Sequence, residues 1–375
     1  MYKKHLSVFL LFVFIVALVF SCKKETSSSN DAINEISSQS ANKVKPPMAT
    51  KSIYATGLND PRGLKFGPDG NLYVAEAGVG GTISSANFNC QQAPPPFGPY
   101  FGSPTGARIS KIVGGVRTTV TTQLPTAISS IHDVFGAADV AFLDNVLYVL
   151  ETGGGCSRGL PANPSGIYKV NSNGTTSLVA DLSAWQHAHP VAHPEPHDFE
   201  PDGSWYSMVV VDTFFYALEA NHGELVKVTR QGEIRRVVDF SATEGHIVPT
   251  AMDYRGNFYV GNLGTFPIMG DSKILKVTPS GNVHMVADSL SAVLGLVVAK
   301  NSWMYVLEMT VGAPFPTPGT GTILAISPSG DRSVLTSGIN FPTGMTMGPD
   351  GNLYVSTWGF GMPPGGGQVT KVTLQ

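Results

Sequence analysis

Four glutamates and one asparagine share one position of a recurring motif, three residues after a tyrosine. In chain order this position holds Glu76, Glu151, Glu219, Asn262, Glu308 and, in the last copy, Thr357. Carboxylates brought to one place repel one another, so a cation, a proton or a basic neighbour must offset their charge. Oxygen ligands of this kind suit Ca²⁺. The alternative is that each glutamate accepts hydrogen bonds from backbone amides of its own repeat.

Histidines gather in a second candidate site. His187, His189, His193 and His197 are close together in the sequence; Glu195 lies among them, and Asp198 and Glu200 follow directly. Imidazoles at this density can bind Zn²⁺ or another transition metal. Prolines interrupt the segment, so we expect no helix that would set the ligands at a fixed spacing. A solvated loop is the alternative.

Two cysteines and a long insertion complete the candidates. Cys90 and Cys156 follow the second strand of adjacent repeats and would form a disulfide in an oxidising compartment, the alternative being two free thiols. The insertion Gly78–Gly106 carries prolines and aromatic residues. It predicts either an irregular lid with exposed aromatics suited to a partner or a glycan, or a segment packed over the rim of the repeat.

An internal repeat positions all these residues. Residues 61–74 (PRGLKFGPDGNLYV) and 342–355 (PTGMTMGPDGNLYV) are near copies, with weaker copies between them. Each copy contains a short apolar strand, a tight turn and a second strand with the tyrosine, and a later hairpin follows. Four antiparallel strands per repeat are typical of one blade of a β-propeller.

The repeat count predicts how the ring closes. The sixth repeat stops after its third strand, at residues 369–374, and residues 52–57 supply the missing strand from before the first repeat. Such pairing removes two open sheet edges. The sequence therefore predicts an all-β, six-bladed β-propeller over residues 51–375, with the last blade closed by the N-terminal strand. Its topology would bring the recurring glutamates toward the channel mouth.

The N-terminal residues indicate export. The apolar run Leu6–Phe20 is short for a membrane span and ends at a cysteine after a small residue, which is typical of a lipoprotein signal. We expect residues 1–22 to be the signal peptide with lipidation at Cys22, and residues 23–50 to be a polar, flexible tether. No retention aspartate follows the cysteine, so we expect an envelope protein anchored by lipid, at the outer membrane.

Composition and motifs exclude several classes of function. Charged residues make up 14% of the chain and the net charge is −3, which provides no field for nucleic acid. The sequence contains no Gly-x-Ser-x-Gly elbow, no phosphate-binding loop and no His-Glu-x-x-His motif. Nucleophilic catalysis therefore has no support from the sequence.

The motifs resemble those of a known family. The opening Gly57–Leu64 (GLNDPRGL), the segment Glu200–Ser207 (EPDGSWYS) and Leu218–Asn221 (LEAN) are similar to the ScyD/ScyE family of secreted bacterial propellers. That family stands beside the NHL-repeat and SMP-30/gluconolactonase-like propellers. The resemblance implies a six-bladed fold and provides no catalytic residues to carry over.

Two classes of function remain. The first is a monomeric binding protein that holds a small molecule, a glycan or a protein on its loop-rich face. The alternative is a metal-dependent hydrolase or lactonase of the SMP-30/gluconolactonase type, in which the glutamates hold the ion. The repetitive placement of the glutamates, without a paired acid and base, favours the first.

Overall fold

A computed structural model describes residues 49–375. The signal peptide, Cys22 and nearly all of the tether lie outside the described residues. None of the helices in the described part of the chain is long and apolar enough to cross a membrane.

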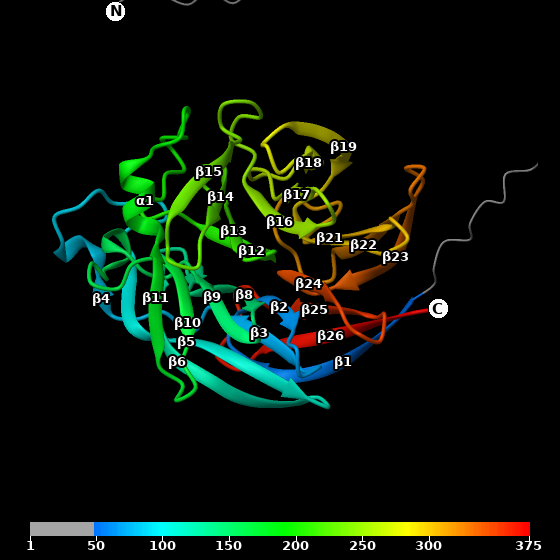
Figure 1. Cartoon of the computed structure of the whole chain (residues 1–375), viewed down its shortest axis with the longest axis horizontal. Coiled ribbons are helices and arrows are strands. Elements are labelled where there is room, and N and C mark those ends of the chain that lie inside the picture. Colours follow the sequence, from blue (N-terminus) through cyan, green and yellow to red (C-terminus); the bar gives the residue numbers. More distant parts are fainter. Residues whose placement is uncertain (1–48) are drawn as a thin grey trace, which may run out of the picture. The chain divides into compact units, whose positions relative to one another are not determined.

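The strands form six sheets, one for each blade, and Figure 1 shows their inner strands around the centre of the ring. The first blade contains β2 (Pro61–Phe66), β3 (Leu72–Glu76), β5 (Phe101–Val113) and β6 (Val116–Ile128), with the short strands β4 (Ile83–Ser84) and β7 (Val134–Phe135). The second contains β8 (Ala137–Leu143), β9 (Val146–Glu151), β10 (Gly166–Val170) and β11 (Thr176–Asp181). The third contains β12 (Trp205–Val211), β13 (Phe214–Glu219), β14 (Glu224–Val228) and β15 (Ile234–Asp239).

The other three blades follow the same order from the channel outward. The fourth contains β16 (Pro249–Tyr254), β17 (Phe258–Asn262), β18 (Ser272–Val277) and β19 (Val283–Leu290). The fifth contains β20 (Val293–Val298), β21 (Met304–Glu308), β22 (Gly321–Ile326) and β23 (Arg332–Ile339). The sixth contains β24 (Gly344–Met347), β25 (Leu353–Thr357), β26 (Gly367–Leu374) and β1 (Ala49–Leu58). The prediction of a six-bladed propeller is confirmed.

The N-terminal strand closes the ring as the sequence predicts. β1 is antiparallel to β26, from Ala49 opposite Leu374 to Leu58 opposite Gly367. Figure 1 shows β1 in blue beside β26 in red. The strand is longer than expected at both ends, because the pairing continues past the segment 52–57.

The recurring tyrosine of the second strand joins neighbouring blades. Its ring packs against a phenylalanine of the next blade around the ring in at least four places, which are Tyr73–Phe142, Tyr148–Phe215, Tyr216–Phe258 and Tyr354–Phe66. Ring centroids in these pairs are 4.5–5.0 Å apart, within the range at which aromatic pairs attract. The motif is therefore a packing device as well as a marker of the repeat.

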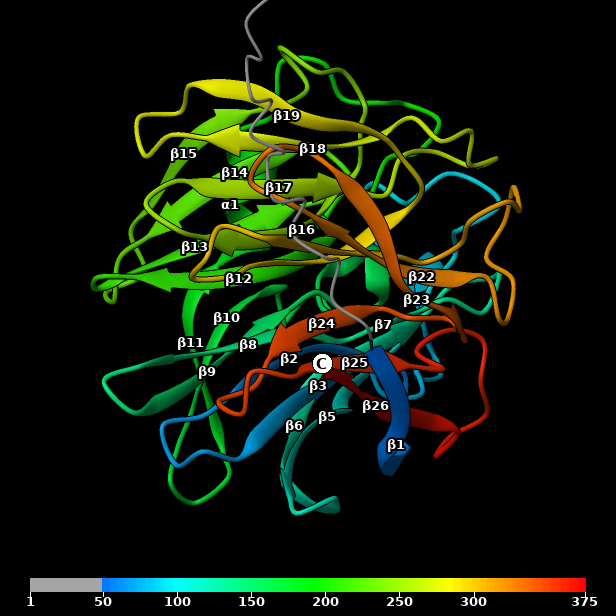
Figure 2. The same ribbon diagram turned by 90° about the vertical axis from the view of Figure 1, so that its right-hand side faces the viewer.

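The propeller has two unlike faces. Tight hairpins turn at the left of Figure 2, and the long loops gather at the right. The turns need glycines with positive φ, such as Gly70 at φ 73° in the Pro-Asp-Gly-Asn turn. We call the second surface the long-loop face: it carries the connections from second to third strand and those between blades. The helix α1 (Leu182–Ala188) lies on one of these connections.

Candidate functional site

The recurring carboxylates fasten each blade together. Each lies at the end of a second strand, and three of them accept a hydrogen bond from a backbone amide just before the innermost strand of their own blade. The bonds are Asn59 N to Glu76 Oε2 (2.7 Å), Ser204 N to Glu219 Oε1 (2.5 Å) and Ser291 N to Glu308 Oε1 (2.7 Å). Asn262 has the same place and donates from Nδ2 to the carbonyl of Ile247 at 2.8 Å.

These residues do not form the cation site expected at the channel mouth. Arg108 and Ser110 donate to Glu76, and the amides of His222 and Gly223 donate to Glu219. Within residues 49–375, no group of three or more His, Cys, Asp or Glu side chains is placed to hold a metal ion. Protein donors within the blade use the oxygens of Glu76, Glu219 and Glu308, so these side chains form no shared site for Ca²⁺.

Burial still perturbs two of the carboxylates. It raises the pKa of Glu308 to about 7, partly offset by the hydrogen bond from the Ser291 amide. It also raises the pKa of Glu151 well above its usual range. Glu151 accepts from the Gly153 amide at 2.5 Å through Oε1, whereas its buried Oε2 has no partner among the described residues.

The four histidines of the second candidate site do not converge. His187 Nε2 lies 3.2 Å from Asp202 Oδ1, and His189 stacks on Trp185 with ring centroids 3.8 Å apart. His193 and His197 have hydrogen bonds through their backbone amides. The expectation that no helix forms here is wrong for the first of them, because α1 ends at Ala188, before the prolines begin.

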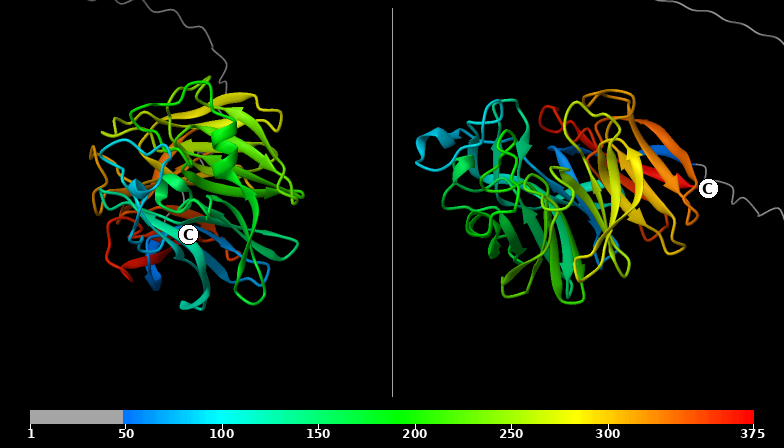
Figure 3. Two further views of the ribbon diagram at one scale, coloured as in Figure 1. Left: turned by 90° about the vertical axis from the view of Figure 1, so that its left-hand side faces the viewer. Right: turned by 90° about the horizontal axis from the view of Figure 1, so that it is seen from above.

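The structure joins Cys90 and Cys156 in a disulfide between loops of the first two blades. The insertion that carries Cys90 is more ordered than an irregular lid: it contains β4 and a 3-10 turn at Ser85–Asn87, and β5 begins at Phe101. Figure 3 shows it, in light blue, at the edge of the molecule. Its Tyr100 is fully buried, so the expectation of exposed aromatics is wrong for that residue.

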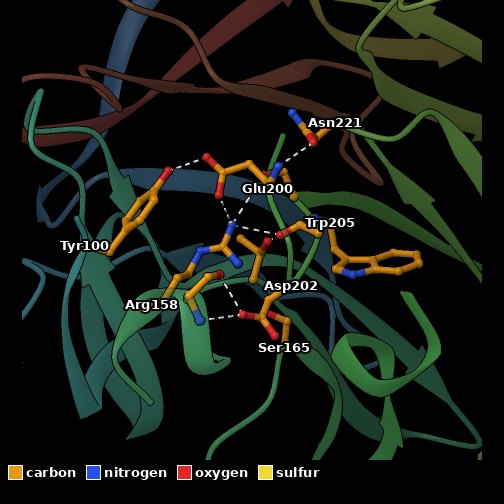
Figure 4. A network of polar contacts seen from close by, with 12 residues as sticks. Tyr100, Arg158, Ser165, Glu200, Asp202, Trp205 and Asn221 are labelled. Atoms are coloured by element: carbon orange, nitrogen blue, oxygen red, sulfur yellow. Dashed lines mark hydrogen bonds and ion pairs between the residues drawn. The ribbon is translucent and has the colours of Figure 1, made fainter. Parts of the chain in front are cut away.

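A buried ion-pair network holds the insertion that contains Tyr100 against the rest of the protein (Figure 4). Arg158 is fully buried and donates from Nη2 to Glu200 Oε2 at 3.3 Å and to the Gly203 carbonyl at 2.8 Å. The hydroxyl of Tyr100 donates to the other oxygen of Glu200. Burial raises the pKa of Glu200 to about 7, while the charge of Arg158 acts in the opposite direction.

The neighbouring aspartate completes the network. Asp202 Oδ2 accepts from the amide of Ser157 at 2.7 Å and from its hydroxyl at 2.6 Å. Gly155 lies against it at φ 104°, and a Cβ there would come within 2.1 Å of Asp202 Cγ. Glu200 and Asp202 of the motif Glu200–Ser207 therefore hold the loops of the long-loop face in place through buried hydrogen bonds, which is a structural role.

The channel mouth on this face holds a different set of charged groups. Arg62, at the start of β2, donates from Nη2 to Asp133 Oδ1 at 3.2 Å and to the carbonyl of Val134 at 2.8 Å. Asp60, two residues before it, is 8% exposed, and Oδ1 has no hydrogen-bond partner in the described chain. Burial raises the pKa of Asp60 to about 6, with Arg62 lowering it and Asp133 raising it.

Tyr206 bridges the channel below these residues. It comes from β12 in the third blade, and its hydroxyl donates to the carbonyl of Thr343, at the start of the sixth, at 2.9 Å. It lines a cavity of about 30 Å³ inside the ring and a second of about 70 Å³ beside Arg62 and Asp133. The second has room for a few water molecules or for the end group of a larger ligand.

Sequence reasoning missed Asp60 and Arg62, although it used their segment to find the repeat. The signal was a break in the repeat: Asn59-Asp60-Pro61-Arg62 aligns with Asn340-Phe341-Pro342-Thr343, so two charges replace an aromatic and a hydroxyl. Asp60 and Phe341 share a left-handed backbone, at φ 45° and 38°. The same backbone conformation therefore holds a carboxylate in the first repeat and an aromatic ring in the last.

The sequence matches no family model and no curated protein. A protein of unknown function from Bacteroides thetaiotaomicron is similar in structure, with a TM-score of 0.55 and 11% identity over 88% of this chain and 77% of that one. A gluconolactonase from Xanthomonas campestris is similar with a TM-score of 0.55 and 10% identity, over 89% of this chain and 96% of that one. A putative glucose dehydrogenase from Thermus thermophilus is similar with a TM-score of 0.54 and 16% identity, over 87% of this chain and 100% of that one. At these identities the similarity shows the propeller fold alone.

Proposed function

We propose that this chain is a ligand-binding β-propeller that holds a polar end group of its ligand at the channel mouth, beside Arg62, Asp133 and Asp60. The site lies on the long-loop face, and Tyr206 limits its depth. A cavity of about 70 Å³ is too small for a sugar or a cofactor. The rest of the ligand therefore lies outside the cavity, on the loops.

Asp60 is the observation that carries this proposal. Buried polar groups nearly always have a hydrogen-bond partner, and an exception requires an explanation. Asp60 is a buried carboxylate whose Oδ1 lacks one in the described chain. It does not itself line the cavity of about 70 Å³, but Arg62, two residues further along the chain, does. A perturbed acid in such a position is typical of a functional site. A ligand that donates to Asp60 would compensate for its desolvation.

The binding function can be tested with small probes on the full-length protein. Melting temperature would be followed against butyl and octyl amines, carboxylates and alcohols, and against simple sugars. We expect at least one class to stabilise the protein saturably, by about 2.7 kcal/mol at a hundredfold its dissociation constant. Asp60→Asn should reduce this effect.

Asp212→Asn is the matched control, since Asp212 is exposed, has φ 54° and lies in a hairpin of the opposite face. It should bind like the unchanged protein. Failure of every class to stabilise the protein, or equal stabilisation of the Asp60→Asn variant, would contradict the proposal.

A metal-dependent lactonase remains the alternative function, supported by the propeller fold that this chain shares with a gluconolactonase. No ligand set for the ion is present among residues 49–375. Saturable hydrolysis of D-glucono-1,5-lactone, dependent on added Ca²⁺, would favour the lactonase over the binding protein. Membership of the ScyD/ScyE family, the lipid anchor at Cys22 and the outer-membrane address remain predictions from the sequence.

A further inference from the structure

An apolar surface lies on the long-loop face over the fourth and fifth blades. We call it the apolar shelf and define it by four exposed side chains, Phe266, Met269, Val311 and Phe315. The rings of Phe266 and Phe315 are stacked, with centroids 6.0 Å apart. The loops that carry the shelf, 263–271 and 309–320, contain one charged residue, the exposed Asp271, and the adjacent loop 358–366 contains none. Such a surface is typical of an interaction site for an uncharged, apolar group.

The polar groups of the shelf favour an apolar occupant over a sugar. Sugar recognition needs free hydrogen-bonding side chains beside the aromatic rings. The hydroxyls of Thr310 and Thr320 are bonded to each other at 2.9 Å, and that of Thr317 donates to the carbonyl of Phe315 at 2.9 Å. Three of the hydroxyls in these loops are therefore already engaged within the loops.

The shelf is continuous with the channel mouth. Ile268 and Met309, from the two shelf loops, belong to one hydrophobic cluster, and Tyr206, Phe341 and Phe360 pack against it. Tyr206 also lines the cavity beside Arg62. This hydrophobic cluster therefore connects the shelf with the mouth.

The charges at the mouth indicate which end group fits. The charged groups that face Asp60 are Arg62 and Asp133, so two carboxylates surround one guanidinium. Arg62 is already bonded to Asp133, whereas Asp60 lacks a donor at Oδ1. A cationic donor would satisfy Asp60 and balance the site, while an anion would add a third negative charge.

We propose that the ligand is an amphipathic amine, whose ammonium group binds Asp60 at the channel mouth and whose uncharged, apolar body lies on the shelf. This inference rests on the proposed binding function and specifies the class of its ligand.

Calorimetric titration of the full-length protein with octylamine, octanoate and butylamine separates the two parts of the ligand. We expect octylamine to bind at least tenfold more tightly than octanoate, because of the charge at the mouth. It should also bind at least tenfold more tightly than butylamine, since each buried methylene adds about fourfold. The affinity for octylamine should rise between about pH 5 and 7 as Asp60 ionises and stay level above.

Two variants assign these effects to residues. Asp60→Asn should remove the preference for the amine and keep the chain-length effect. Met269→Ser with Phe315→Ser should remove the chain-length effect and keep the preference. Both shelf side chains are exposed, so the fold should tolerate their loss. Met285→Ser with Val334→Ser, at exposed positions of β19 and β23, is the matched control and should change neither effect.

Octanoate binding as tightly as octylamine would overturn the assignment of the end group. Equal affinities for octylamine and butylamine would overturn the role of the shelf. The proposed binding function would still stand in that case if Asp60→Asn weakened the binding of both amines. Binding to phosphatidylcholine vesicles that is lost in the Met269/Phe315 variant would identify the shelf as a membrane surface and overturn this inference. If no probe of any class binds, the proposed function itself fails.

Discussion

Just before β2, Asp60 combines a left-handed backbone with a buried carboxylate. Its φ is 45°, a conformation that aspartate and asparagine tolerate better than most residues. Burial raises its pKa to about 6, so the folded protein holds a charge that water would stabilise better. Such a residue lowers the stability of the protein at neutral pH. Its presence at the mouth is explained if its carboxylate binds a ligand.

We therefore expect Asp60→Asn to stabilise the protein at neutral pH. A carboxyl whose pKa is higher in the folded state than in the unfolded state destabilises the fold increasingly as the pH rises from the unfolded to the folded pKa, and fully above the folded pKa. Without ligand, the variant should gain roughly 3 kcal/mol at about pH 7.5, and the gain should disappear as the pH falls below about 4. Chemical denaturation at a series of pH values measures it.

The exposed Asp212 provides the control here as well, because Asp212→Asn should leave the pH dependence unchanged. A loss of stability in Asp60→Asn at neutral pH would mean that the carboxylate makes a favourable contact in the free protein. It would also remove the main support for a ligand at this position.

At the scale of single strands, the carboxylates at the ends of the second strands differ in how many donors they satisfy. Glu219 accepts from four backbone amides, those of Ser204, Asn221, His222 and Gly223. Glu308 accepts from the amide of Ser291. Asn262 shows that an amide side chain can serve in the same place. The same substitution should therefore have unlike effects in different blades.

Glu219→Gln should destabilise the protein, because its NH₂ group would face at least one pair of amide donors and lose bonds to a charged acceptor. We expect a loss of about 2–4 kcal/mol. Glu308→Gln keeps its one acceptor and removes a buried charge whose pKa is about 7. At about pH 8 its free energy of unfolding should be unchanged or higher by about 1–2 kcal/mol. Denaturant titration of both variants, side by side, measures the contrast.

Equal losses in the two variants would show that charge at this position matters in every blade. The position of these residues was predictable from the spacing after the tyrosine, but the direction of their side chains was not. In a propeller both faces of each sheet are covered by neighbouring blades, so alternation along a strand does not tell which atoms a terminal side chain reaches. The carboxylates were expected to form a ring at the mouth. Their side chains instead make hydrogen bonds within their own blades.

For the molecule as a whole, the repeat predicted the six blades and their closure because each blade restates the same strands and turns. The long-loop face was not predictable in this way, since its loops are not repeated. The contact of Tyr100 with Glu200 joins residues 100 positions apart, through two loops of unlike sequence. Arg158, at its centre, stands in no motif. The charges of the mouth were visible only as a departure from the repeat.

Closure gives the last prediction, which concerns the stability of the whole ring. β1 pairs with β26 along its full length and buries Ala55 and Leu58 against the first and last blades. Deleting residues 23–48 leaves this strand intact and should leave the melting temperature unchanged. Deleting residues 23–57 exposes β26 as an open edge and should cost roughly 5 kcal/mol or more.

A peptide with the sequence of residues 49–58 (ATKSIYATGL) tests whether the strand itself is responsible. An extended peptide can add to an exposed sheet edge through its main chain. Added to the longer deletion, it should raise the melting temperature saturably, and a scrambled peptide should not. A shorter deletion that unfolds the protein would place essential contacts before Ala49. A longer deletion that melts like the full chain would mean that the sixth blade holds its place with three strands, and that the ring does not depend on closure.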